Sequence, residues 1–120
     1  MLAGCLRNAR AVGELAQRLG EKIAVIPAGE QWPDGRLRPA IEDWIGAGAI
    51  LSHLTHRTAE AETAVEAFAS TRETLLEHIR GCVSGRELID RGFESDVLLA
   101  AELDVSQCAP TLVGGAYVGS

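Results

Sequence analysis

Apolar residues between positions 3 and 19 recur three or four residues apart, with polar side chains in the positions between them. This period is that of an amphipathic helix with one buried stripe. Gly20 follows directly and favours the end of the helix at that point. The apolar stripe consists of Leu6, Ala9, Val12, Leu15, Ala16 and Leu19.

The next segment, residues 22–27 (KIAVIP), is apolar without alternation. Short continuous apolar runs are typical of strands that are buried on both faces, as in a parallel sheet. A helix, a glycine and then a buried strand form part of an α/β unit. The pattern therefore predicts a central strand at residues 22–27.

A loop at residues 28–37 separates this strand from a second predicted helix, at about residues 39–53. Pro39 suits the first position of that helix, and Glu42 and Asp43 suit its first turn. Gly46 and Gly48 each disfavour a helix by about 1 kcal/mol relative to alanine. We expect both glycines to permit close packing against a neighbouring element.

The remainder of the chain predicts further helices. A long helical pattern covers residues 59–81, and the SGRE motif at residues 84–87 matches a capping box that starts a short helix reaching about residue 91. Another helix is expected from residue 94 or 95 to residue 103. Near the end of the sequence, apolar residues on both sides of Gly114 and Gly115 predict a β-hairpin.

These elements predict one α/β domain over residues 1–120, with helices packed on a small mixed sheet. The strands are few for a doubly wound sheet. We therefore expect the domain to be part of a larger α/β protein or to complete its sheet with a partner chain, either another copy or a complementary half.

Composition narrows the functional classes. A net charge of −6 and the absence of a basic run argue against binding to nucleic acid. No apolar run reaches the roughly 18–20 residues of a membrane span, and no secretory signal pattern is present, so a cytoplasmic protein is expected. The 3 cysteines lack a C-x-x-C spacing and predict buried, reduced thiols.

Residues 24–50 carry the most specific chemistry of the chain. Glu42 and Asp43 are adjacent acids at a predicted helix start, and adjacent carboxylates suit Mg²⁺. Acids at this position also complement the helix dipole without any metal, and this alternative stays open. Glu30 lies in the loop after the predicted strand, where α/β proteins often place ligand-binding residues.

Two groups of residues are candidates for anion binding. Arg36 and Arg38 flank one residue of extended chain, so their guanidinium groups are expected on one side, where they could hold phosphate or sulfonate. Ser84, Gly85 and Arg86 lie at a predicted helix start, whose free amides could also bind an anion. A solvated surface pair and a simple helix cap are the structural alternatives.

An ordered series of motifs resembles the 2-phosphosulfolactate phosphatase (ComB-like) family. The motifs are LAGCLRNARAV at residues 2–12, VIPAGE at 25–30, RLRPAIEDWIGAGAI at 36–50, SGRELIDRGFESDVLLAAELDVS at 84–106 and APTLVGGAYV at 109–118. Members of the family are longer, and this chain resembles their C-terminal half. The resemblance implies an α/β fold and a role in coenzyme M biosynthesis.

The activity implied by the resemblance is Mg²⁺-dependent hydrolysis of 2-phosphosulfolactate to sulfolactate and phosphate. Glu42 and Asp43 would then be metal ligands, and Asp43 and Glu30 would act in catalysis. Arg36, Arg38 and the Ser84–Gly85–Arg86 turn would hold a small phosphorylated and sulfonated substrate. The competing hypothesis is a non-catalytic module that binds a small anion or pairs with a partner chain. A third reading is that these acids and arginines are structural only.

Overall fold

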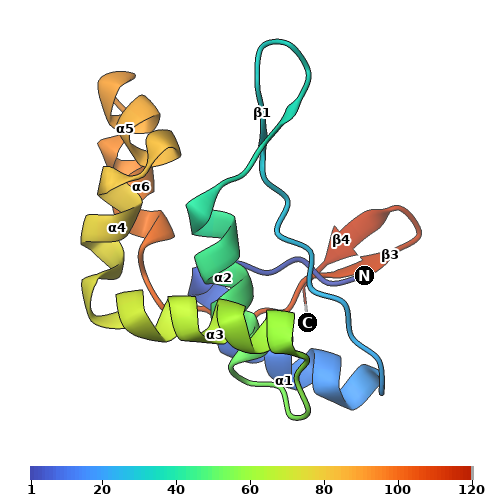
Figure 1. Ribbon diagram of the computed structural model, residues 1–120. Helices are drawn as coiled ribbons and strands as arrows, with labels where there is room; N and C mark the ends of the chain where they lie inside the picture. The colour runs from blue at the N-terminus through green and yellow to red at the C-terminus, as the bar shows by residue number, and fades with distance from the viewer. Residues whose placement is uncertain (120) are drawn as a thin grey trace.

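The computed structural model describes residues 1–119 and combines six α-helices with two short hairpins (Figure 1). In chain order the elements are η1 (Leu6–Asn8), α1 (Ala9–Leu19), β1 (Glu30–Gln31), β2 (Leu37–Arg38), α2 (Ile41–Leu51), α3 (Ala59–Thr71), η2 (Arg72–Thr74), α4 (Leu75–Gly81), α5 (Val83–Asp90), α6 (Glu94–Ala100), β3 (Thr111–Val113) and β4 (Ala116–Val118).

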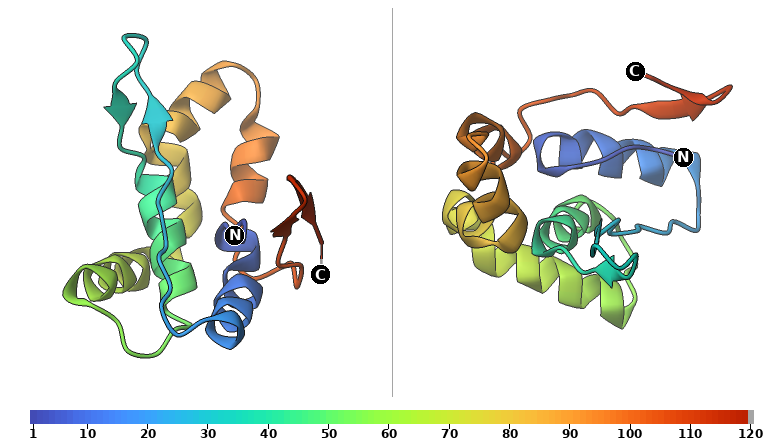
Figure 2. Two further views of the ribbon diagram at one scale, coloured as in Figure 1. Left: turned by 90° about the vertical axis from the view of Figure 1, so that its right-hand side faces the viewer. Right: turned by 90° about the horizontal axis from the view of Figure 1, so that it is seen from above.

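Helix α2 is the centre of the core. Its residues from Ile45 to Ile50 are all buried, and a helix that is apolar on every side requires neighbours on every side. Helix α3 crosses it on one flank and α1 lies on another, while α4, α5 and α6 stand together beside it and contribute buried residues to the same core (Figures 1 and 2). The residues shared by this core include Leu6, Val12, Ile45, Phe68, Leu75, Ile79 and Val97.

The predicted α/β class is confirmed, because helices and strands are both present. The strands nevertheless form two separate antiparallel pairs, β1–β2 and β3–β4, and not a central sheet on which helices pack. Neither pair is large enough to be stable alone in water, so each depends on the helical core beside it.

The strand predicted at residues 22–27 is wrong for the described structure. The segment is extended but pairs with no other strand of residues 1–119, and Ile26 is 81% exposed. A strand needs a neighbour for its N–H and C=O groups, and the apolar pattern alone does not supply one. Figure 2 shows the segment running along the flank of α2 between α1 and the β1–β2 hairpin.

Several helix ends differ from the predicted ones. Helix α2 begins at Ile41 after an extended Ala40, so Pro39 precedes the helix instead of opening it. The long helix predicted at residues 59–81 is divided by the 3₁₀ turn η2 into α3 and α4. The turn redirects the chain, so α4 runs in a different direction from α3 while Leu75 and Ile79 remain in the core (Figure 1).

The terminal hairpin is confirmed. Strands β3 and β4 pair across Gly114 and Gly115, whose φ angles of +59° and +86° suit the tight turn that joins them. Leu2 forms a β-bridge with Thr111, so the first residues of the chain extend this small sheet. Within residues 1–119, no helix has the length and apolarity that a bilayer crossing requires.

Candidate functional site

Two segments that are far apart in sequence meet where β2 leads into α2 and α5 begins. Arg38 at the end of β2 reaches Glu87 on α5, and Glu42 in the first turn of α2 interacts with Cys82 at the start of α5. Most of the residues that sequence reasoning selected therefore lie in one region. The contacts within it decide what each residue can do.

Arg38 is a buried cation that its neighbours hold in one orientation. Its side chain is 10% exposed, and its Nη1 and Nη2 donate to the two carboxylate oxygens of Glu87 at 3.2 and 3.1 Å. The guanidinium carbon also lies 5.3 Å from the centre of the Trp32 ring, a cation–π contact. Such a forked pair adds geometric specificity as well as energy.

Glu30 stands directly opposite Arg38 in the register of the β1–β2 hairpin. Residues opposite one another in an antiparallel pair share a face of the sheet, with Cβ atoms about 5 Å apart. Glu30 is exposed, so its carboxylate faces solvent beside the Arg38 backbone. The hairpin register therefore brings the candidate residues Glu30 and Arg38 next to one another.

Glu42 and Asp43 have different neighbours despite being adjacent. Asp43 Oδ2 accepts a 2.6 Å hydrogen bond from the backbone N–H of Gly29, which has a φ of +71°. Glu42 interacts instead with the Cys82 thiol. Asp43 thus fixes the loop before β1, while Glu42 faces α5.

The described residues do not form a complete protein cage for a metal ion. No group of three or more His, Cys, Asp or Glu side chains within residues 1–119 is arranged to hold one. Mg²⁺ can be held by one or two protein carboxylates when water and a substrate phosphate supply the remaining ligands. Glu42 and Asp43 fit this role as single carboxylates, but their contacts do not converge on one point.

Cys82, rather than Ser84, caps helix α5. Its Sγ accepts from the backbone N–H of Gly85 at 3.3 Å and donates to the Ile79 carbonyl at 3.1 Å. The predicted capping box of Ser84 and Glu87 is therefore wrong, because the helix starts earlier and Glu87 is engaged by Arg38. Burial, and secondarily the Glu42 carboxylate, raise the pKa of the Cys82 thiol above its ordinary value.

The Ser84–Gly85–Arg86 turn differs from an open anion site. The Gly85 amide already serves the Cys82 sulfur, and Gly85 is buried so closely that a Cβ would overlap the Ile79 carbonyl. Ser84 is half-buried, and the Arg86 side chain is exposed. Of the three residues, Arg86 retains the best access to a ligand in solvent.

Arg36 and Arg38 do not act as a pair in this structure. Arg36 lies in the turn of the hairpin with an 80% exposed side chain, and it forms a 2.7 Å ion pair with Asp34. This guanidinium lowers the pKa of the Asp34 carboxyl below its ordinary value. Arg38 is instead buried against Glu87, so the two guanidinium groups have different partners and different exposure.

Sequence reasoning missed three contributors to the site: Trp32, Cys82 and Glu87. Cys82 was expected to be an inert buried thiol, although its position just before the SGRE motif could have indicated a cap. Glu87 was assigned to the capping box, and no local pattern connects it with Arg38, which is 49 residues away. Cys5 is also exposed and not buried as expected, while all three cysteines are free thiols.

The raised pKa of Cys82 predicts slow alkylation. Because only the thiolate reacts and a raised pKa lowers its fraction, half-buried Cys82 should react with iodoacetamide at pH 8 more slowly than exposed Cys5. Glu42→Gln should accelerate the alkylation of Cys82, because it removes a nearby negative charge that disfavours the thiolate. Peptide mass spectrometry over a time course measures both rates.

Glu14→Gln is the matched control, since Glu14 is an exposed acid on α1. Equal acceleration of Cys82 by both substitutions would show that the Glu42 carboxylate has no specific effect on this thiol.

Comparison with known proteins places the chain in a family. The model of the 2-phosphosulpholactate phosphatase family matches residues 1–115, and the chain belongs to that family. A relative from Methanothermobacter thermautotrophicus, named 2-phosphosulfolactate phosphatase, is 31% identical over 114 residues. A relative from Thermotoga petrophila, named probable 2-phosphosulfolactate phosphatase, is 30% identical over 123 residues.

The chain spans about half the length of these curated relatives. The match with the Methanothermobacter protein covers 95% of this chain and 48% of the relative, and the match with the Thermotoga protein covers 98% and 50%.

Proposed function

We propose that this chain contributes to the Mg²⁺-dependent hydrolysis of the phosphate ester of 2-phosphosulfolactate, which yields sulfolactate and phosphate in coenzyme M biosynthesis. Membership of the family supports this reaction class. The observation that carries the site assignment is the convergence of Arg38, Glu42 and the start of α5 from distant parts of the sequence. The substrate is strongly anionic, so its site must supply fixed positive charge.

Arg38 is the residue best suited to orient the substrate. A guanidinium carries five N–H donors, and Glu87 accepts from only two of its nitrogens, so donors remain for an anion. Burial and the Trp32 contact restrict the motion of this cation before substrate arrives. Arg36 and Arg86, both exposed, would provide additional charge at the rim of the site.

Glu42 is the first candidate for a Mg²⁺ ligand, and Asp43 is the second, because Asp43 Oδ2 already accepts from Gly29. Bound Mg²⁺ would neutralise charge on the phosphate oxygens. Glu30 is an exposed carboxylate near Arg38 that could orient a water molecule. Ser84 and Gly85 would act indirectly by fixing the start of α5.

A non-catalytic module that binds a small anion or a partner chain is the second candidate function. Two observations favour it: the described residues contain no three-ligand metal cluster, and the chain spans about half of each curated relative. Under this hypothesis Arg38, Glu42 and Asp43 stabilise the fold and the chain turns over no phosphate ester by itself.

Phosphate release from 2-phosphosulfolactate by the full chain tests the first proposal. Turnover should require added Mg²⁺ and stop with a chelator, and Glu42→Gln should lower it by at least about tenfold. Asp43→Asn should lower it as well, whereas Glu14→Gln on α1 should not. Circular dichroism and thermal melting establish that each variant is folded.

The opposite result favours the second candidate. If the folded chain binds phosphate or sulfate in calorimetry without any Mg²⁺-dependent turnover, it acts as a binding module. If turnover occurs and Glu42→Gln and Asp43→Asn leave it unchanged, the metal assignment is wrong.

A further inference from the structure

We infer that residues 22–28 are a docking strand for a second polypeptide segment, namely the part of the longer relatives that this chain does not match. The segment is extended, connects α1 with β1 and belongs to neither hairpin. This inference concerns assembly and uses no result on catalysis, so it can fail or succeed independently of the proposed phosphatase activity.

The backbone of the segment is available for pairing. Between Lys22 and Ala28 no backbone N–H or C=O group makes a hydrogen bond to another described residue, and the next pairing begins at Gly29 with the Asp43 carboxylate. A row of unpaired backbone groups in extended chain is a template for another strand. In the chain alone these groups can bond only to water, and prolonged exposure to water is unfavourable for the apolar side chains of this segment.

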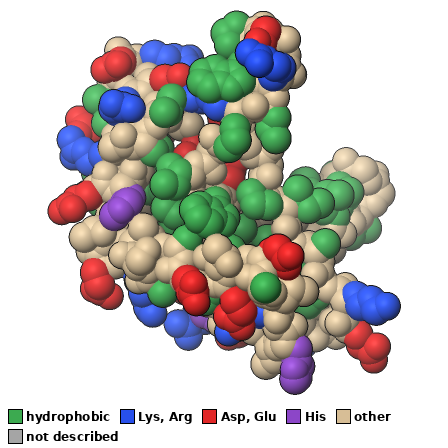
Figure 3. Space-filling model, viewed as in Figure 1, with side chains coloured by type: hydrophobic (Ala, Val, Ile, Leu, Met, Phe, Trp, Pro, Cys, Tyr) green, Lys and Arg blue, Asp and Glu red, His purple; other side chains and the backbone are tan. Residues whose placement is uncertain are grey.

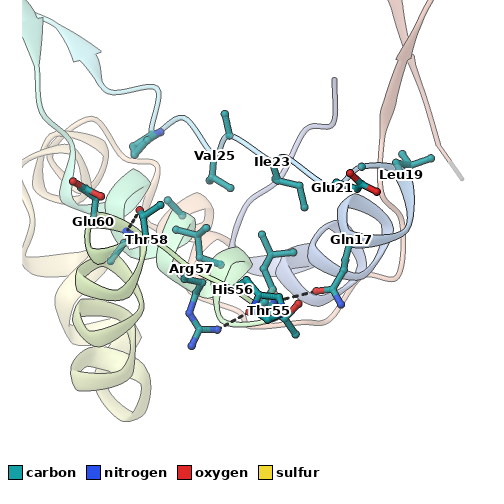
Figure 4. Close-up of a pocket in the computed structure, with 18 of the residues that line it drawn as sticks. Gln17, Leu19, Glu21, Ile23, Val25, Thr55, His56, Arg57, Thr58 and Glu60 are labelled. Atoms are coloured by element: carbon teal, nitrogen blue, oxygen red, sulfur yellow. Dashed lines mark hydrogen bonds between the residues drawn. The ribbon is translucent and has the colours of Figure 1, made fainter.

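The side chains of the segment alternate between a face that lies toward the helices and a face that lies toward solvent. Ile23 and Val25 point toward the helices and line a cavity of about 880 Å³ between the segment, α2 and the start of α3 (Figure 4). Val25 packs on the core, whereas Ile26 is 81% exposed on the other face. Helices therefore cover one face of the segment, and within residues 1–119 nothing covers the other.

The exposed apolar surface continues beyond the segment. Leu37, Ile41 and Trp44 are 68%, 43% and 42% exposed, and they lie along β2 and the first turns of α2. Figure 3 shows hydrophobic side chains gathered across the middle of this face and on the projecting hairpin. Contiguous apolar surface of this kind marks an interaction site when it is large.

The length of the relatives indicates which partner fits. Each matches this chain along nearly all of its sequence yet is about twice as long, so the unmatched half of a relative is a polypeptide available to cover these surfaces. A second copy fits less well. Two paired copies of the segment would satisfy the backbone groups along one edge, but no helix would cover Ile26. Pairing would also bring together two chains that each have a net charge of −6.

A binding experiment tests the inference directly. The probe is the part of the Methanothermobacter relative that lies outside the match, expressed as a separate labelled polypeptide and first shown to bind the relative's own matching half. The full chain should bind this probe in fluorescence anisotropy. Hydrogen exchange of the amides of residues 23–26 should slow by at least about 100-fold in the complex.

Two variants distinguish specific binding at residues 22–28 from non-specific hydrophobic association. Ile26→Asp should weaken binding by at least about tenfold, because it places a charge in a desolvated contact. Val113→Asp on the β3–β4 hairpin should not, although Val113 is also an exposed aliphatic residue of an extended segment, at 60%. Both side chains are mostly in solvent, so neither substitution should unfold the chain.

The inference is overturned if the probe binds its own half but not this chain, or if Ile26→Asp has no more effect than Val113→Asp. It is also overturned if light scattering shows a dimer of the chain alone that already protects residues 23–26, since the occupant would then be a second copy.

Discussion

Replacing Gly48 with alanine should destabilise the protein by roughly 3 kcal/mol, which is the scale of a steric insertion into a packed core that cannot relax. Gly48 lies on α2 where α3 approaches most closely. A Cβ at this position would overlap the Ala64 carbonyl and approach the Phe68 Cβ to 2.9 Å. Backbone atoms of a neighbouring helix cannot move aside as a flexible side chain can.

Gly46 provides a control in the same helix. A Cβ there would meet nothing within 4 Å, so Gly46→Ala should stabilise the protein by up to about 1 kcal/mol through higher helix propensity. Urea unfolding of both variants measures the two free energies. If both substitutions change the free energy of unfolding by the same amount in the same direction, the close α2–α3 contact is not the reason for glycine at position 48.

The second large effect is expected from the Arg38–Glu87 pair. Arg38→Ala should cost roughly 2–3 kcal/mol, because it removes a buried stem, the contact with Trp32 and the partner of Glu87. Glu87→Ala should cost less, roughly 1–2 kcal/mol, since its carboxylate is 55% exposed and water partly replaces it.

A double-mutant cycle on these two residues isolates their interaction from losses of packing. The control is Arg36→Ala on the same hairpin, whose 80% exposed side chain predicts a change within about 0.5 kcal/mol. A coupling free energy near zero between Arg38 and Glu87 would show that the buried guanidinium does not depend on its carboxylate.

The pair also bears on ligand binding. If Arg38 holds a substrate anion, sulfate should raise the melting temperature of the wild-type chain. Arg38→Ala should remove that shift, whereas Arg18→Ala, at an exposed position on α1 outside the site, should leave it. If both variants keep the shift, the anion binds elsewhere and Arg38 is structural.

Local signals predicted the helices and the terminal hairpin well. The helical period before Gly20, the stop at Gly20 and the Gly114–Gly115 turn each depend on side chains only a few residues apart. The structure confirms the stop and the turn, and it makes residues 6–19 helical but not residues 3–5. Two helix starts differ from the predicted ones by one or two residues, and only the second has a side-chain cap. Ala40 instead of Pro39 precedes α2, and Cys82 instead of Ser84 caps α5.

Long-range relationships could not be predicted from one sequence. The apolar pattern at residues 22–27 correctly indicates extended chain, but pairing depends on a partner strand that residues 1–119 do not provide. The candidate residues Arg38 and Glu42 were selected by chemical type, whereas their contacts with Glu87 and Cys82 depend on how α5 folds back. The types of residue at this site could therefore be predicted from the sequence, but the contacts between them could not.

The bridge between Leu2 and Thr111 ties together two stretches that are separated by nearly the whole described chain. Backbone hydrogen bonds from Ala3 to Pro110 and from Leu112 to Met1 strengthen this connection. Closing so long a loop carries a high entropic cost before any contact forms, so the connection should arise late in folding, after the helices have assembled. Loss of residues 1–3 would remove these backbone hydrogen bonds from the β3–β4 hairpin, while the bonds from Asp104 to Leu6 and from Ser106 to Arg7 would remain.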